Sequence, residues 1–339
     1  MADYKGIKGF KVQSLASDPS TDVEGQVWYN TTSNALKYTG PGVGAWATGG
    51  QMSTARRVCA AFGTQSATVA GGGGPPYTAN TEEYDGSTWA SGGAYPSSPA
   101  LISNMGGAGV LTAGLGFGGS NPIGVQVTTT AEYDGSTWTL GGAMTTARAA
   151  VGSFGTQTAA IGVCGQGYTA PIPTSTPNCE SYNGVAWSDE TGSPTEAQLG
   201  GACGTSTAGL YAGYSPKTPT QTQTWNGTAW TMVSPGAFTI DMYAVAVFGT
   251  QTSAIKSGGL PPGTNTTPNM QSADEWDGST WTATTSKSVA NASGNGTGTA
   301  ALGLVFGGYD PLASPTSLPG DLNEEWTKPD FSAKTVTVS

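Results

Sequence analysis

Histidine is absent from this chain of 339 residues. Histidine is the usual general base of a catalytic triad and a common ligand of metal ions, so histidine-dependent sites of both kinds are excluded. We therefore expect no cofactor, no metal site and no catalytic residues. The protein is not expected to be an enzyme.

Cysteine is scarce, and its spacing carries no motif. The four cysteines are Cys59, Cys164, Cys179 and Cys203, and no two of them form a C-x-x-C pair. Neither a metal knuckle nor a dense disulfide framework is indicated. We expect these residues to be small buried hydrophobic side chains.

Cations are also few. The chain holds 12 Lys and Arg against 22 Asp and Glu, which gives a net charge of −10. So few cations cannot neutralise many phosphates, and nucleic acid is not an expected partner. No apolar run is long enough to cross a bilayer, and residues 1–20 lack the apolar segment of an export signal. Membrane insertion is not expected.

Glycine and proline, by contrast, are abundant, with 53 and 21 residues. Together with the low content of charged residues, they favour many short strands joined by tight turns over helices. An all-β fold is predicted.

A short tryptophan unit recurs along the chain. Five versions of it occur, EYDGSTW at 83–89 and 132–138, SYNGVAW at 181–187, TWNGTAW at 224–230 and EWDGSTW at 275–281. Trp46 belongs to a looser sixth copy, and successive tryptophans lie 43 to 51 residues apart. A period of about 40 to 50 residues is typical of a four-stranded propeller blade.

Within each unit, Asp-Gly or Asn-Gly predicts a hairpin with a two-residue loop. In the first unit, Tyr84 would then lie opposite Ser87, and Glu82 opposite Trp89. Tyr84 and Trp89 would share the face that packs on the neighbouring blade. The predicted packing residues are Tyr84, Trp89, Tyr133, Trp138, Tyr182, Trp187, Trp225, Trp230, Trp276 and Trp281.

A second segment accompanies each tryptophan unit. Clear copies span 56–72, 149–165 and 243–259, and weaker copies span 103–119, 199–213 and 290–308. Each predicts two short strands joined by a turn at Gly-Thr-Gln. The first strand is built from small residues, which fit the crowded centre of a ring of strands.

Gly-Gly after the second strand, a variable loop, and an aromatic residue with Trp five residues later make the repeat similar to the kelch repeat over about residues 36–328. Arg56 and Arg148, in the phrase M-x-T-A-R, resemble an arginine of that repeat, which the second, fourth and sixth copies lack. In the unit at 181–187, Glu180 is displaced by one position. The resemblance implies a six-bladed kelch-like β-propeller over 26–339 with a short N-terminal extension at 1–25. Residues 38–46 are expected to complete the last blade near 325–328.

Carboxylates were considered as catalytic groups. Glu83, Glu132 and Glu275 occupy the same position in different repeats, and no feature of the sequence brings two of them together. We expect a structural or solvated role for them.

The expected blade has short, uniform turns on one face and long, dissimilar connections on the other. Variable loops on a rigid scaffold are a common arrangement for recognition. Tyr77, Tyr168, Tyr214 and Tyr309 begin four of the long connections and are the candidate ligand-binding residues. They could equally cover the blade edges.

The N-terminal stretches YKGIKGFKVQSLASDPS and EGQVWYNTTSNALKY resemble the N-terminal portion of virion structural proteins of tailed bacteriophages. The resemblance implies a tail-fibre, head-fibre or decoration protein that is assembled in the host cytoplasm and displayed on the particle. The N-terminal segment would contact other virion proteins, and the propeller would bind a protein or a host-surface glycan. A secreted carbohydrate-binding or carbohydrate-active propeller and a cytoplasmic kelch adaptor are the alternatives.

Overall fold

The computed structural model describes residues 12–20, 25–96, 102–169, 172–215, 221–262, 270–310, 320–329 and 331–336. These residues form strands, turns and irregular segments, and Met270 alone among them is helical. The all-β prediction is confirmed for this part of the chain. The chain divides into a terminal unit, Met1–Gly44 with Lys328–Ser339, and a main unit, Ala45–Thr327.

The main unit contains six four-stranded antiparallel sheets, which we number in chain order. Sheet 1 comprises β5 (Ala60–Thr64), β6 (Ala67–Gly71), β7 (Thr81–Tyr84) and β8 (Trp89–Ser91). Sheet 2 comprises β9 (Gly106–Val110), β10 (Ala113–Phe117), β11 (Thr130–Tyr133) and β12 (Trp138–Leu140). Sheet 3 comprises β14 (Gly152–Thr156), β15 (Ala159–Val163), β18 (Cys179–Tyr182) and β19 (Trp187–Glu190).

Sheets 4 to 6 repeat this order. Sheet 4 comprises β20 (Gly201–Thr205), β21 (Ala208–Ala212), β22 (Thr222–Trp225) and β23 (Trp230–Val233). Sheet 5 comprises β24 (Ala246–Gly249), β25 (Ala254–Ser257), β26 (Ala273–Trp276) and β27 (Trp281–Ala283). Sheet 6 comprises β28 (Asn295–Gly298), β29 (Leu302–Phe306), β30 (Asn323–Thr327) and β4 (Ala45–Thr48). A small sheet of β13 (Arg148–Ala149), β16 (Gln166–Thr169) and β17 (Ile172–Ser175) adjoins sheet 3 in sequence.

An early strand supplies the fourth strand of sheet 6. β4 pairs antiparallel with β30, and Trp46 lies opposite Trp326 with ring centroids 5.1 Å apart. The expected pairing near residue 325 is confirmed for Trp46. Tyr38, which was expected to take part, instead belongs to β3 of the terminal unit and pairs with Lys334. The terminal unit thus takes up residues 26–44, which the sequence had assigned to the repeats.

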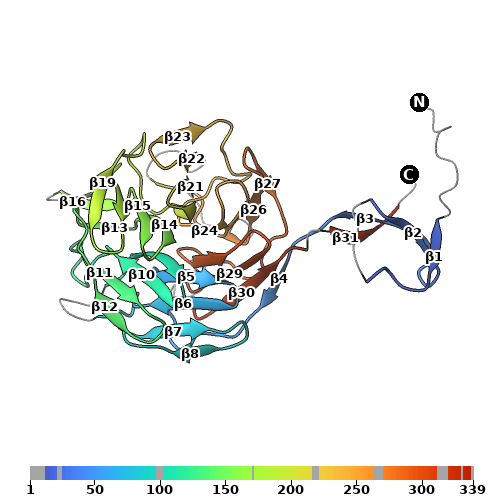
Figure 1. The fold of residues 1–339 in the computed structure, drawn as a ribbon, viewed down its shortest axis with the longest axis horizontal. Helices are drawn as coiled ribbons and strands as arrows, with labels where there is room; N and C mark the ends of the chain where they lie inside the picture. The colour runs from blue at the N-terminus through green and yellow to red at the C-terminus, as the bar shows by residue number, and fades with distance from the viewer. Residues whose placement is uncertain are drawn as a thin grey trace. The chain divides into compact units, whose positions relative to one another are not determined.

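The sheets stand around a common centre (Figure 1). Their first strands contact one another in the order β5, β9, β14, β20, β24 and β28, and β28 contacts β5. The second residue of the Gly-Gly motif explains part of this arrangement, because its N–H donates to the next sheet. At the last junction, Gly308 donates to the carbonyl of Arg56 at 3.0 Å. Its φ of +87° and that of Gly307, +63°, are easily adopted by glycine.

The Asp-Gly hairpin has a longer loop than predicted. Tyr84 pairs directly with Trp89, so the loop holds four residues and not two. The carboxylate of Asp85 accepts hydrogen bonds from the N–H groups of Ser87 (2.8 Å) and Thr88 (2.7 Å). This side-chain capping replaces the type I′ turn, and the predicted register was wrong. The predicted common face is confirmed, since the rings of Tyr84 and Trp89 lie 5.1 Å apart.

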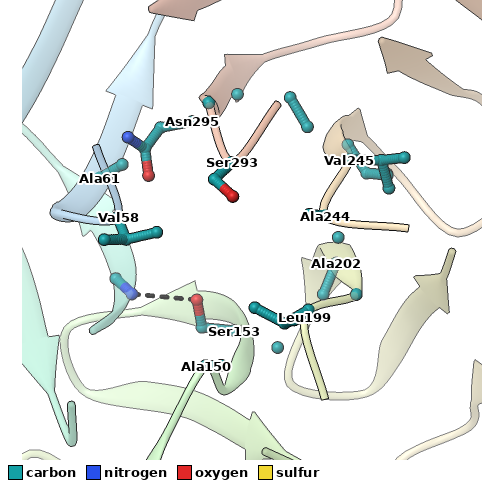
Figure 2. Close-up of a pocket in the computed structure, with 18 of the residues that line it drawn as sticks. Val58, Ala61, Ala150, Ser153, Leu199, Ala202, Ala244, Val245, Ser293 and Asn295 are labelled. Carbon is teal, nitrogen blue, oxygen red and sulfur yellow. Dashed lines mark hydrogen bonds between the residues drawn. The ribbon is translucent and has the colours of Figure 1, made fainter. Parts of the chain in front are cut away.

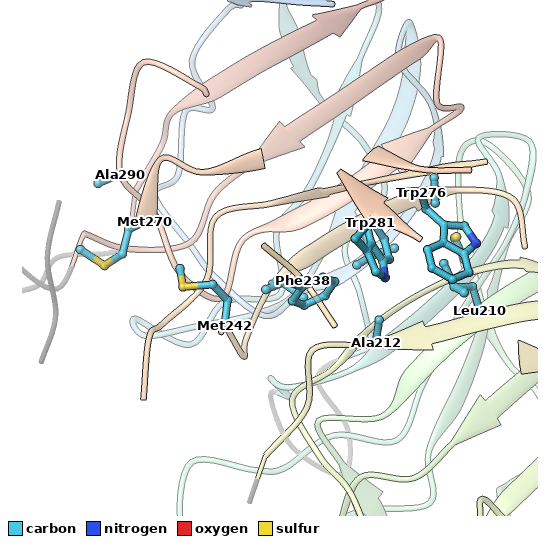
Figure 3. Packing of buried hydrophobic residues seen from close by; sticks show 12 residues of the cluster. Leu210, Ala212, Phe238, Met242, Met270, Trp276, Trp281 and Ala290 are labelled. Atoms are coloured by element: carbon cyan, nitrogen blue, oxygen red, sulfur yellow. The ribbon is translucent and has the colours of Figure 1, made fainter. Parts of the chain in front are cut away.

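The tryptophan at the start of each outer strand packs between sheets. Trp138 of sheet 2 contacts Phe62 of sheet 1, and its indole N–H donates to Thr81 of the same sheet at 2.9 Å. Between sheets 4 and 5, Trp281 lies in a cluster with Leu210 and Ala212 (Figure 3). Full burial of one such ring stabilises the fold by about 2 to 3 kcal/mol. The four cysteines also fill the core as free, buried thiols, as predicted.

Odd and even sheets differ in a regular way. Sheets 1, 3 and 5 carry a phenylalanine that faces a glycine of the following sheet, and a turn glutamine that donates to carbonyls of the preceding sheet. A Cβ on these glycines would lie 2.0 to 2.2 Å from the ring. The pairs are Phe62 with Gly114, Phe154 with Gly209, and Phe248 with Gly303, and the glutamines are Gln65, Gln157 and Gln251. A two-sheet unit therefore occurs three times.

The repeated glutamate accepts a hydrogen bond from the tyrosine of the next sheet. Tyr182 donates to Glu132 at 2.5 Å, and Tyr133 donates to Glu83. Tyr84 makes the equivalent bond to Glu325, which joins sheet 1 to sheet 6. Burial, and then this carboxylate, raise the pKa of Tyr84 to about 12, so the phenol keeps its proton at neutral pH. For Glu83 and Glu132, these bonds are the structural role that the sequence predicted.

The terminal unit contains one described sheet. Its strands are β1 (Gln13–Leu15), β2 (Val27–Asn30), β3 (Ala35–Pro41) and β31 (Phe331–Thr335), in that order. β2 and β3 form the hairpin that EGQVWYNTTSNALKY predicted, with Val27 opposite Tyr38. Asp18 lies over one face, where it accepts from Trp28 (3.1 Å), Asn30 (2.7 Å) and Lys37 (2.8 Å).

Deletion of residues 1–48 should lower the free energy of unfolding by at least about 3 kcal/mol, because it removes β4 and exposes Trp326. Deletion of residues 1–44 keeps β4 and should retain most of the stability of the main unit. Urea unfolding of both proteins makes the comparison. Equal stability of the two deletions would show that β4 does not complete sheet 6.

The bond between Tyr84 and Glu325 should stabilise the junction of sheets 1 and 6. Tyr84→Phe should reduce stability by about 1.5 kcal/mol, the usual value for a hydrogen bond to a charged group. Glu325→Gln combined with Tyr84→Phe should cost less than the two single changes together, since the pair acts as one interaction. Tyr182→Phe, at an internal junction, is the matched control. A junction that is open in solution would leave Tyr84→Phe without effect while Tyr182→Phe destabilises.

Candidate binding surface at the strand-start end

One end of the main unit gathers the beginnings of the first strands. In an antiparallel sheet of strands in chain order, the first-to-second and third-to-fourth turns share one end. The second-to-third connections and the links between sheets therefore lie at the other end, where each first strand begins. We call this the strand-start end. The Gly-Thr-Gln and Asp-Gly turns lie at the opposite, turn end.

Six residues with positive φ mark the strand-start end. One precedes the first strand of each sheet, with φ between +51° and +61°. They are Val58, Asn104, Ala150, Leu199, Ala244 and Ser293. A side chain disfavours this conformation by about 1 to 2 kcal/mol per residue, so neighbouring contacts must hold it.

Backbone hydrogen bonds link these residues from sheet to sheet. Four of the six donate their N–H to the carbonyl of the one before, as in Ala244 to Leu199 (2.9 Å) and Ser293 to Ala244 (2.9 Å). Ala150 to Asn104 and Leu199 to Ala150 continue the chain of bonds. The result is a rim of main-chain atoms, which we call the positive-φ rim.

The rim encloses a cavity of about 160 Å³ (Figure 2). Small side chains such as Ala61, Ala202 and Val245 line it, together with the polar groups of Ser293 and Asn295. No ionisable side chain other than a cysteine lines it. Burial raises the pKa of that thiol, Cys59, to about 11, so it is not a thiolate nucleophile at neutral pH. The cavity can hold a small neutral group or water but offers no acid–base pair.

Buried ion pairs lie beside the segments that lead into the rim. Arg56, two residues before Val58, is fully buried and pairs with Glu82 of its own sheet. Its guanidinium also donates to the carbonyls of Gly72 (3.1 Å) and Asn80 (2.5 Å). A guanidinium with several acceptors is well suited to such a site. The first arginine of the phrase S-T-A-R-R is thus a clamp on the backbone that leads into the rim.

Sheet 3 repeats this clamp. Arg148 pairs with Glu180 at 2.8 Å, and both are fully buried. Glu180, which looked displaced in the sequence, pairs with Gly162 in the ladder as Glu82 pairs with Ala70 in sheet 1. It therefore occupies the position of Glu82, and the difference lies in Ser181, which stands where Glu83 does.

In other sheets, different side chains occupy the place that the arginine and glutamate take in sheets 1 and 3. In sheet 5, Met242 stands in place of the arginine, so this copy also lacks it, and Lys256 reaches Asp274 at 3.3 Å from β25. In sheet 2, Ile102 and Ala131 fill the space in one apolar cluster. With each of these sets of side chains, the main chain follows the same path to the rim.

The segment before sheet 6 contains a buried lysine that forms no ion pair among the described residues. Lys287 is 3% exposed and donates to the side chain of Asn291, two residues before Ser293. Burial lowers the pKa of Lys287 to about 7, with Lys256 lowering it further and Glu324 opposing both. The equivalent residue, four before the clamp position, is uncharged Met52 in sheet 1 and Met144 in sheet 3.

The four candidate tyrosines do not form one site. Tyr77 is half-buried, and its hydroxyl donates to the carbonyl of Asn121 at 3.4 Å. Tyr168 lies in β16, and its side chain is outside the described part of the structure. Tyr214 is fully buried, stacks on Tyr211 and bonds to Gln223 (2.9 Å), so it belongs to the core and presents no ring surface.

Tyr309 remains at the strand-start end, together with a residue that the sequence analysis missed. The guanidinium of Arg57 lies over its ring, 4.3 Å from the centroid. Arg57 is half-buried and forms no ion pair among the described residues, whereas Arg56 and Arg148 are both paired. Cation–π stacking holds a guanidinium in place without neutralising it. The second arginine of the phrase S-T-A-R-R was the available signal.

The described residues were also compared with the requirements of a metal centre and of a membrane-spanning helix. No group of three or more Cys, Asp or Glu side chains among the described residues could hold a metal ion. In the same part of the chain, no helix has the length and apolar character needed to cross a bilayer. No family model matches the chain, and no curated protein matches it either.

Stability should rise with pH near neutrality because of Lys287. A lysine with a pKa of about 7 in the folded state and 10.5 in the unfolded state gives up its proton earlier when folded. The stability linked to this group is therefore lost as pH falls through about 7 and is gained as pH rises towards 10.5. Urea midpoints should be higher at pH 8.5 than at pH 6, and Lys287→Met should reduce this difference. An unchanged difference in the variant would remove Lys287 as the cause.

Proposed function

We propose that the chain is a non-enzymatic virion structural protein of tailed bacteriophages, of tail-fibre, head-fibre or decoration type, that displays a six-bladed kelch-like β-propeller. The six sheets would be its blades. The six four-stranded sheets, the contact of β28 with β5 and the hydrogen bond from Tyr84 to Glu325 support this assignment of the fold. The Gly-Gly bonds between sheets and the arginine clamps are in keeping with the kelch resemblance.

The observation that carries a binding role is the contrast between the two ends. The turn end consists of short, similar loops whose polar side chains bond within their own turns, as Asp85 does, or to the preceding sheet, as Gln65 does. The strand-start end bears the positive-φ rim, the cavity and Arg57 on Tyr309. Strain and an unpaired cation held on an aromatic ring are typical of binding surfaces. We assign the displayed, ligand-binding face to the strand-start end.

Arg57 suggests the chemistry of the ligand. The main unit carries 17 carboxylates and six cations by sequence, so a guanidinium without a carboxylate partner in the described part of the chain stands out. An anionic group on a host-surface glycan or protein would supply the missing partner, with the Tyr309 ring fixing the guanidinium. The terminal unit, with its phage-like hairpin, would attach the protein to the particle.

Mass spectrometry of purified phage particles from the source of the sequence tests the virion assignment. The protein should copurify with particles through a density gradient, in proportion to known structural proteins. Recovery only in the soluble fraction of the lysate would contradict the assignment.

Binding of the labelled protein to host cells tests the face. Arg57→Ala should weaken binding about tenfold or more, because a charged hydrogen bond contributes about 1.5 to 3 kcal/mol. Tyr309→Ala should act in the same direction. Leu302→Ala is the matched control, since Leu302 is 49% exposed at the turn end of β29, the strand that ends three residues before Tyr309. Equal losses for Tyr309→Ala and Leu302→Ala would remove the distinction between the two ends.

A further inference from the structure

The sheet of the terminal unit has one covered face and one open face. Side chains alternate along β2, where Trp28 and Asn30 are buried and Val27 and Tyr29 are exposed. Asp18 covers the first face through its bonds to Trp28, Asn30 and Lys37. Trp28, Asn30 and Lys37 of the covered face are therefore occupied by their bonds to Asp18.

The open face is apolar. Register places Val27 opposite Tyr38 and Tyr29 opposite Leu36, so these four side chains share one side of the β2–β3 hairpin. Val336 continues the face, since its N–H bonds to the carbonyl of Leu36. The exposed fractions are 45% for Val27, 37% for Tyr29, 38% for Leu36, 39% for Tyr38 and 41% for Val336. A contiguous exposed patch of this composition marks an interaction site.

Lys334, opposite Tyr38 on the edge strand β31, is the charged residue of this face. The charges of the two units differ sharply. By sequence, the terminal unit has six lysines and five carboxylates, whereas the main unit has six cations and 17 carboxylates. Two copies that approach through their main units repel each other, but two terminal units do not.

We infer that the open face, formed by Val27, Tyr29, Leu36, Tyr38 and Val336, is the surface through which one copy of this chain pairs with a second copy. A neutral aromatic and aliphatic patch is its own complement, as a two-fold contact requires. Neither the contact nor its test depends on the proposed virion role.

The size of the face sets the expected strength. Four strands spaced about 4.8 Å apart, with about five residues each at 3.3 Å per residue, cover on the order of 300 Å². Stable interfaces bury about 800 Å² per partner. The dimer should therefore be weak, with a Kd on the order of 100 µM, and would gain from avidity wherever several copies are held close together.

Sedimentation equilibrium of the full chain between 10 and 500 µM tests the inference. The apparent mass should rise towards that of a dimer. It should rise further in 0.5 M NaCl, because salt screens the repulsion between the acidic main units and does not weaken an apolar contact. A wild-type chain that stays monomeric over this range, or a dimer that dissociates in salt, would overturn the inference and leave a different partner as the occupant of the face.

Two substitutions locate the contact. Leu36→Asp should abolish association, and Leu36→Ser should weaken it about tenfold, while slow hydrogen exchange of the amides of β2 and β3 reports that the unit is folded. Leu140→Asp is the matched control, because Leu140 is 62% exposed on β12 of the main unit. If Leu36→Asp misfolds, Leu36→Ser decides. Association that survives Leu36→Ser in a folded protein, or that is lost equally in Leu140→Asp, would place the contact elsewhere.

Discussion

The main unit depends on the pairing of β4 with β30. Five of its six sheets are made from strands that follow one another in chain order, whereas sheet 6 takes its outer strand from residues 45–48, near the other end of the chain. Trp46 and Trp326 face each other there, and Tyr84 of sheet 1 reaches Glu325 on the same strand β30. The two ends of the repeat are therefore joined by the interactions that link internal sheets. Every other junction relies on the first strands being held around this centre.

The positive-φ rim is a ring of strained backbone at the centre of the six sheets. Backbone strain at Val58 and its five equivalents persists because neighbouring contacts hold it. Ala150, Leu199 and Ala244 are fixed by backbone hydrogen bonds on both sides, and in sheets 1 and 3 a buried arginine lies two residues earlier. The clamp changes from Arg56 with Glu82 to Lys256 with Asp274 or to apolar packing of Ile102 with Ala131, but the backbone path is the same. The backbone shape of the cavity therefore does not depend on which side chains form the clamp. Side chains at the strand-start end can vary without loss of the scaffold.

Sequence patterns predicted much of this architecture, because the repeated residues act through local rules. The Trp spacing, the Gly-Gly motif and the small first strands indicated the strands and their sheets, and Trp46 was correctly assigned to the last sheet. The register of the Asp-Gly hairpin was missed because the Asp85 carboxylate caps the turn, which a rule based on backbone conformation does not include.

The candidate site was harder to predict, because it rests on contacts between distant segments. The sequence places Tyr214 near the start of a loop, whereas its ring stacks on Tyr211 in the core. Arg57 became a candidate because its guanidinium lies over the ring of Tyr309, more than 250 positions away. The six positive-φ residues do not all share one side-chain type, so no sequence motif predicts them. Their one signal is their fixed place before each first strand.

Hydrogen exchange of the native full-length chain tests most directly whether the sheets form a closed, cooperative ring. The amides of β4 that pair with β30 should exchange with the same slow rate as those of β8 and β12, which require global opening of the main unit. Fast exchange confined to β4 and the outer edge of β30 would show an open junction and would contradict the account.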